Sequence, residues 1–184
     1  MRVISGKAKG RRLKTLEGLD VRPTADRVKE GLFSIIQFDL PGCRFLDLFA
    51  GSGQIGIEAL SRDAAYVLFN DQNRKAQELI KENLISVGLY QKSRVIAMDA
   101  RAYLLSLKEQ FDIVFLDPPY HQQLLDEILP LVAEKTTPHG IIICEHETDE
   151  QLPQQAGAFV LVKQYRYGKI MLSKYMIPQQ DDLR

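Results

Sequence analysis

The chain has 184 residues, ordinary apolar and charged fractions, and a formal net charge of zero, which indicates one domain-sized globular unit. No apolar run approaches the roughly 18 residues of a membrane-spanning helix, and no apolar segment follows the basic N-terminus as in a secretory signal, so we expect a cytoplasmic protein without a membrane partner. The distant Cys43 and Cys144 indicate neither a disulfide framework nor a cysteine zinc site.

Positive charge is concentrated near the N-terminus. Residues 1–29 contain nine Lys or Arg and three acids, which leaves a net charge of minus six on the remainder. Clustered cations gain most from phosphate contacts, so this basic arm predicts an anionic partner; the alternative is a solvated, frayed terminus. The candidate nucleic-acid contacts are Arg2, Lys7, Lys9, Arg11, Arg12, Lys14 and Arg22.

Two elements are predicted before the main fold. Residues 1–16 alternate well enough for a small β-ribbon, and residues 22–36 predict a helix capped by Thr24, with Val28, Leu32 and Ile36 at helical spacing. We therefore divide the chain into an N-terminal appendage, 1–40, and a main domain, 41–178.

From residue 44, short apolar runs alternate with helical patterns. Strands are expected at 44–49, 66–70, 94–99, 111–117 and 140–145, and helices at 54–61, 74–87, 101–107 and 123–134. This alternation predicts βαβ units and a parallel sheet covered on both faces. Two further β-rich runs, 158–168 and 169–176, turn near Gly168 and should form an antiparallel pair that closes the sheet.

A glycine-rich loop follows the first strand. Residues 51–56 read GSGQIG, a G-x-G-x-x-G motif in which glycine lets the backbone approach a nucleotide-like ligand closely. Each of the next strands also ends in an acid, so carboxylates should gather at the sheet edge where open α/β folds bind ligands. The cofactor-binding candidates are Asp47, Phe49, Ala50, Gly51, Ser52, Gly53, Asp71, Asp99 and Ala100.

The row of acids narrows the choice of ligand. Asp71 suits a ribose diol, and Asp99 could accept from the exocyclic amine of an adenine. Extra carboxylates would repel the pyrophosphate of NAD but tolerate a cationic sulfonium nucleoside, so S-adenosylmethionine is the better fit. The alternative is that Asp71 and Asp99 are helix N-caps.

The sequence Asp117-Pro118-Pro119-Tyr120 follows the fourth strand. The Asp117 carboxylate and the Pro118 carbonyl can accept the two hydrogens of a nucleobase amine and direct its lone pair at a methyl donor. Pro118 and Pro119 offer no competing N–H, and Tyr120 can stack on an unpaired or flipped base. An ordinary strand-ending turn is the alternative.

Neither the two cysteines nor the "CEHE" sequence, residues 144–147, indicates cysteine nucleophilic catalysis or a metal site. Cys43 lies in a predicted loop and Cys144 in an apolar strand, so neither is well placed as the nucleophile that methylation of a pyrimidine carbon needs. We interpret 144–147 as a strand end with solvated polar residues and expect no metal.

The segments "DLFAGSGQIGIEAL", "DPPY", "RPTADRVKEGLF" and "YGKIMLSKY" together resemble the RsmD family of bacterial 16S rRNA guanine-N2 methyltransferases over nearly the whole chain. The resemblance implies a Rossmann-like class I α/β fold, with a seven-stranded, mostly parallel sheet whose last strand is antiparallel. It also implies S-adenosylmethionine as the methyl donor, with S-adenosylhomocysteine as product.

The same resemblance implies a substrate and a set of site residues. The target would be a guanine of the 966 type in 16S rRNA, within an assembled or assembling small subunit. Asp47, Gly51, Gly53, Asp71 and Asp99 would hold the cofactor, Asp117, Pro118 and Tyr120 the base, and Arg22 and Thr24 would line the site. The chain departs from the family pattern at "FND", residues 69–71, where a Val or Ile is expected before the acid.

Two alternatives remain open. An adenine-N6 methyltransferase acting on DNA or RNA would use Asp117-Pro118-Pro119-Tyr120 equally well. A non-catalytic assembly factor that binds S-adenosylmethionine and RNA would need the glycine loop and the basic arm but not Asp117.

Overall fold

The computed structural model describes residues 1–15, 23–119 and 124–178. Two residues given a binding role by the sequence, Arg22 and Tyr120, lie outside these ranges. Thr24 lies within a described helix, but its side chain is not described. No helix in the described part of the chain is both long and apolar enough to cross a membrane.

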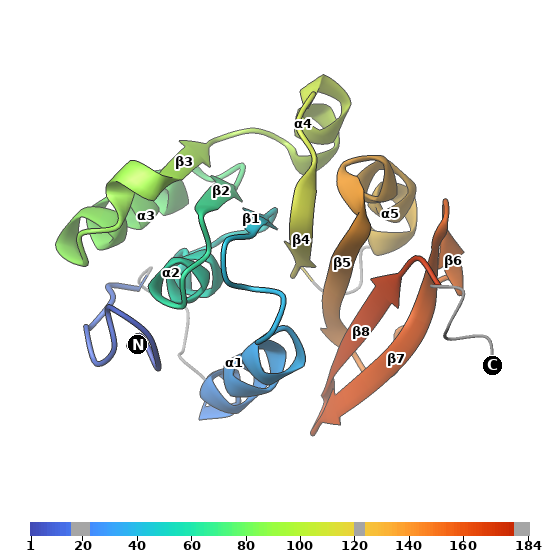
Figure 1. Cartoon of the computed structure of the whole chain (residues 1–184), viewed down its shortest axis with the longest axis horizontal. Helices are drawn as coiled ribbons and strands as arrows, with labels where there is room; N and C mark the ends of the chain where they lie inside the picture. Colours follow the sequence, from blue (N-terminus) through green and yellow to red (C-terminus); the bar gives the residue numbers. More distant parts are fainter. Residues whose placement is uncertain (16–22, 120–123, 179–184) are drawn as a thin grey trace.

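The described strands form one sheet in the order β3-β2-β1-β4-β5-β8-β7-β6 (Figure 1). They are β1 (Arg44–Asp47), β2 (Tyr66–Asn70), β3 (Ser93–Ile96), β4 (Phe111–Leu116), β5 (Thr136–Glu147), β6 (Gln155–Ala156), β7 (Phe159–Tyr167) and β8 (Ile170–Met176). The helices are α1 (Pro23–Ile35), α2 (Gln54–Ser61), α3 (Arg74–Ser86), α4 (Ala100–Ser106) and α5 (Leu124–Glu134), with a 3-10 turn η1 (Tyr90–Lys92).

The first five strands are parallel and the C-terminal strands antiparallel, as predicted. β8 inserts between β5 and β7, so the final hairpin closes the sheet. The sheet has eight described strands instead of the expected seven, because Gln155 and Ala156 pair with Val160 and Phe159. A two-residue strand carries too little periodicity to be recognised in the sequence.

Helices cover both faces of the sheet (Figure 1). One core contains buried residues of α1, α2 and α3, including Phe33, Ile57 and Ile80, and the other contains residues of α4 and α5, including Leu104 and Ile128. The strands are therefore apolar on both sides, which is why they read as continuous apolar runs.

The connections place a topological switch point between β1 and β4, and we term the region at the carboxyl ends of these two strands the crevice. The chain passes from β1 outward to β2 and β3, then returns to the other side of β1 as β4. Loops after neighbouring strands diverge at such a switch point, and ligands of open α/β sheets bind there.

Three local expectations differ in detail. The N-terminal ribbon is reduced to one antiparallel bridge, Arg2 with Arg12. α1 begins at Pro23, so Thr24 lies inside the helix and is not its cap. The "CEHE" residues are not solvated: His146 is buried and its imidazole bonds the Ser173 hydroxyl at 2.7 Å, while Glu145 and Glu147 are half-buried.

Candidate active site

The glycine loop connects β1 to α2 through left-handed backbone. Gly51 has φ +53° and Gly53 has φ +77°, a region that L side chains rarely adopt. The loop is tightened by the Gly53 N–H, which donates to the Ala50 carbonyl at 2.7 Å. A Cβ built on Gly51 meets no atom within 4 Å, so open space lies beside this residue.

Asp47 lies beneath the loop and is buried. The Gly56 N–H donates to its carboxylate at 3.0 Å, which connects the end of β1 to the first turn of α2. Burial raises the pKa of Asp47 to about 7; the Gly56 hydrogen bond opposes the rise, and the charges of Asp117 and Asp71 add to it.

Asp71 connects the end of β2 to the glycine loop. Its carboxylate accepts from the Gly51 N–H at 2.8 Å and from the Asn73 N–H at 2.9 Å. The N-cap of α3 is Asn73, whose side chain accepts from the Lys75 N–H. The cap interpretation is therefore wrong for Asp71.

Asp99, in contrast, is the N-cap of α4. Its Oδ1 accepts from the Ala102 N–H at 2.9 Å, and Ala100, the next residue, is buried as the first residue of the helix. The cap leaves the second oxygen, Oδ2, without a hydrogen bond to any described residue, so capping and ligand binding are compatible at Asp99.

Asn70 is a residue at the crevice that the sequence did not predict. Its Nδ2 donates to the carbonyls of Leu48 at 3.2 Å and Met98 at 3.1 Å, which joins the ends of the first three strands. Its buried Oδ1 has no partner in the described part of the chain. The signal in the sequence was the departure at "FND", where a polar residue replaces the expected Val or Ile.

Asp117, Pro118 and Pro119 follow β4 directly, on the other side of the switch point. Pro118 is buried, Asp117 is half-buried and Pro119 is exposed. Burial raises the pKa of Asp117 above the usual carboxyl range. Asp117 and Asp47 are close enough for the charge of one to affect the other, so the predicted catalytic acid lies near Asp47 across the switch point from the glycine loop.

The crevice has the donors and acceptors that a sulfonium nucleoside requires. Carboxylates follow the strands on both sides of the crevice, and the space beside Gly51 leaves room for a ligand. Like Asn70 Oδ1, the buried Oε1 of Gln54 has no hydrogen-bond partner among the described residues. Phe49, on the strand side of the loop, packs against the α4–α5 core.

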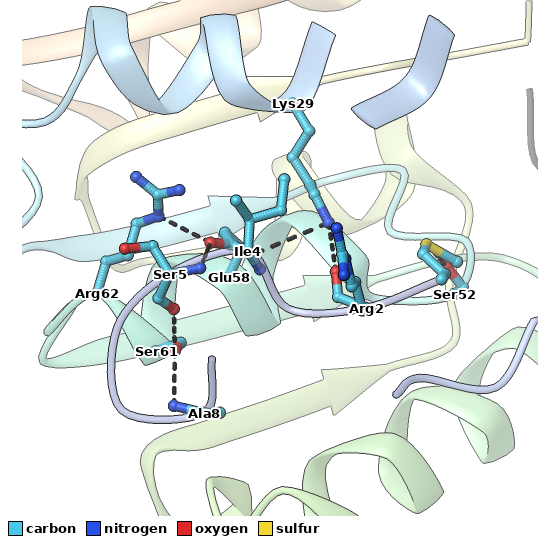
Figure 2. A network of polar contacts seen from close by, with 10 residues as sticks. Arg2, Ile4, Ser5, Ala8, Lys29, Ser52, Glu58, Ser61 and Arg62 are labelled. Carbon is cyan, nitrogen blue, oxygen red and sulfur yellow. Dashed lines mark hydrogen bonds and ion pairs between the residues drawn. The ribbon is translucent and has the colours of Figure 1, made fainter. Parts of the chain in front are cut away.

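The N-terminal arm, residues 1–15, is docked against α2 (Figure 2). The buried carboxylate of Glu58 accepts from the Ile4 and Ser5 N–H groups, both at 2.8 Å, and from Arg62 Nε at 2.8 Å. The ammonium of Lys29 donates to the Arg2 carbonyl at 2.9 Å and lies 3.7 Å from Glu58. The frayed-terminus alternative is wrong for this segment.

The arm also reaches the glycine loop. Asn83 on α3 accepts from the Lys14 N–H at 2.8 Å and donates to the carbonyls of Lys14 at 3.0 Å and Ser52 at 3.1 Å. Ser52 Oγ lies 3.9 Å from the sulfur of Met1. Two buried side chains that the sequence did not single out, Glu58 and Asn83, therefore hold the arm beside the cofactor-binding candidates.

The basic side chains of the arm differ in their surroundings. Lys7 pairs with Asp63, Lys14 pairs with Glu82 at 2.8 Å, and Arg11 donates to the Ser86 carbonyl. The side chains of three others are exposed and have no acidic partner among the described residues: Arg2, Lys9 and Arg12. Arg2 and Arg12 are directly opposed in the bridge, where like charges repel unless an anion intervenes.

Both cysteines are buried. Burial raises the pKa of Cys43 to about 12 and raises the pKa of Cys144 as well. Neither thiol has the low pKa of a reactive nucleophile.

Comparison with known proteins gives consistent matches over almost the whole chain. The model of a family described as "Conserved hypothetical protein 95" matches residues 1–176. YlbH of Bacillus subtilis is 43% identical over 173 residues, covering 91% of this chain and 94% of YlbH. "Ribosomal RNA small subunit methyltransferase D" of Haemophilus influenzae is 37% identical over 157 residues, or 83% and 81% of the two chains. The solved structure of yhhF from Escherichia coli has a TM-score of 0.86 and 32% identity, covering 98% of this chain and 99% of that chain.

Proposed function

Because the chain belongs to the RsmD family, we propose that it transfers a methyl group from S-adenosylmethionine to the exocyclic N2 of a guanine in 16S ribosomal RNA. The observation that carries the proposal is the position of Asp117 and Pro118 directly after β4, across the switch point from the glycine loop. The name of the Haemophilus influenzae relative supports a small-subunit RNA as substrate.

The residues around the glycine loop would bind the cofactor. Asp71 accepts from the ribose hydroxyls, the second oxygen of Asp99 accepts from the adenine amine, and Asp47 attracts the cationic tail. When bound, S-adenosylmethionine supplies an electrophilic methyl on a sulfonium sulfur and leaves as S-adenosylhomocysteine.

Asp117 and Pro118 would bind the target amine. The two acceptors draw the N2 hydrogens away from the plane of the ring, so that the nitrogen lone pair points at the methyl carbon. The new N–C bond forms as the C–S bond breaks, and the methylated nitrogen then releases one proton. The raised pKa of Asp117 suits this carboxylate to accept that proton. Pro119 keeps the segment free of a further N–H donor, and Tyr120 would stack on the base.

The docked arm would contact the RNA backbone. It presents exposed cations close to the crevice, which favours a phosphate next to the target nucleotide. Arg22 and Thr24, just after the arm, would line the same path. The small size of the chain favours recognition of a small-subunit assembly particle over reading of RNA sequence alone.

Replacement of Asp117 by Ala tests this assignment. We expect cofactor binding, measured by calorimetry, to stay within about twofold, while methyl transfer to small-subunit RNA falls by about 100-fold or more, since a preorganised acceptor is lost. The exposed Asp126 provides the matched control, and Asp126→Asn should retain full transfer. Unaltered transfer in Asp117→Ala would rule out the proposed mechanism, and N6-methyladenosine as the product would favour the adenine alternative.

A further inference from the structure

A second carboxylate, Glu145, lies beside Asp117. β4 and β5 are parallel, with Leu116 opposite Cys144, so Asp117 and Glu145 are the next residues along two adjacent chains. Phe115 and Ile143, two positions earlier, both belong to the core under α1 to α3. Side chains alternate along a strand, which puts both carboxylates on that face, with the chains about 4.8 Å apart.

The side-chain carboxylate of Glu145 is half-buried and has no hydrogen-bond or ion-pair partner in the described part of the chain. Burial raises its pKa, and the neighbouring charge of Asp117 raises it further. A carboxylate withdrawn from water is costly unless a donor satisfies it. Glu145 therefore has an unused acceptor next to the catalytic candidate.

The strand order places Glu145 on the substrate side of Asp117. The cofactor-binding candidates follow β1, β2 and β3, whereas β5 lies beyond β4 on the opposite side of the sheet. A ligand atom that contacts both Asp117 and Glu145 must therefore belong to the methyl acceptor, not to the bound nucleoside of the cofactor.

The two candidate bases differ in what they offer next to the reactive amine. Guanine carries an N1–H donor beside its N2 amine, so its edge presents adjacent donors, whereas adenine carries an N1 acceptor beside its N6 amine. We propose, on the basis of the proposed function, that Glu145 accepts the N1–H of the target guanine and makes the site selective for guanine over adenine. Guanine presents two adjacent donors to the two carboxyl groups and so stabilises their ionised forms, whereas a ring nitrogen with a lone pair repels an ionised carboxylate.

The test compares guanine with 2-aminopurine, which keeps the N2 amine but has an N1 acceptor. Each base is placed by ligation at the mapped methylation position of a small-subunit RNA fragment, and kcat/KM is measured for the wild type, Glu145→Gln and Asp149→Asn. Gln can either accept from or donate to N1. Asp149 is an exposed acid just beyond β5, and its variant is the matched control.

We expect the wild type and Asp149→Asn to prefer guanine by about 10- to 100-fold, the effect of one charged hydrogen bond, and Glu145→Gln to reduce that ratio to about threefold or less. If Glu145→Gln keeps the wild-type preference for guanine over 2-aminopurine, or if Asp149→Asn loses that preference to the same extent, Glu145 does not select the base. Neither result would contradict guanine methylation itself. If the wild type transfers no methyl group to the guanine RNA, the proposed function itself fails.

Discussion

At the scale of single residues, burying the Asp47 carboxylate lowers the free energy of unfolding when the carboxylate is ionised. Because burial raises the pKa of Asp47 to about 7, the folded protein keeps this proton to a higher pH than the unfolded chain. The contribution of this carboxyl to the free energy of unfolding is therefore fully present below its ordinary pKa of about 4 and is lost as pH rises through about 7.

This linkage predicts opposite effects of Asp47→Asn on stability and binding. At pH 8 the neutral amide should raise the free energy of unfolding by roughly 1–3 kcal/mol, and at pH 4 the gain should disappear because the wild-type carboxyl is then protonated. Affinity for S-adenosylmethionine should fall. Denaturant unfolding at the two pH values checks the first effect, and an equal gain at both would refute the linkage.

Some residues of the candidate site could be predicted from the sequence and others could not. The glycines and the acids at strand ends could be predicted because each follows directly after an apolar run in the sequence. Glu145 and Asn70 could not, because their significance depends on which strands become neighbours. "CEHE" read as a solvated strand end, and only the β4–β5 register shows that Glu145 faces Asp117.

At the scale of elements, the N-terminal arm is a structured segment held beside the glycine loop. Val3, Ala8 and Leu13 are buried in the core under α1 to α3, and Glu58 satisfies the backbone donors of Ile4 and Ser5. The charge of the arm could be predicted from the sequence, but its anchor could not, because Glu58 is one polar position on an otherwise apolar helix.

The docked arm separates its basic residues into two groups with different expected roles. Neutralising Lys9 and Arg12, which have no acidic partner in the described ranges, should weaken RNA binding and reduce the slope of log K against log salt by about 1.5–2. Neutralising Arg11 and Lys14, which contact α3, should change the slope less. Binding titrations at several salt concentrations measure both, and equal slopes for the two variants would contradict this division.

At the scale of the whole molecule, the sheet order explains why distant segments form one site. The alternation of strands and helices predicted the parallel sheet, and the structure together with its solved neighbours confirms the Rossmann-like class I methyltransferase fold. The order β3-β2-β1-β4-β5 puts the cofactor-binding candidates on one side of the switch point and Asp117 and Glu145 on the other. That division of the sheet edge is the structural basis for the proposed methyl transfer.

The most direct measurement is mass spectrometry of nucleosides from small-subunit RNA of a strain lacking this gene, its parent, and the strain complemented with wild type or Asp117→Ala. We predict that N2-methylguanosine decreases in the deletion strain and returns with the wild type but not with Asp117→Ala. An unchanged amount of N2-methylguanosine in the deletion strain would contradict the account.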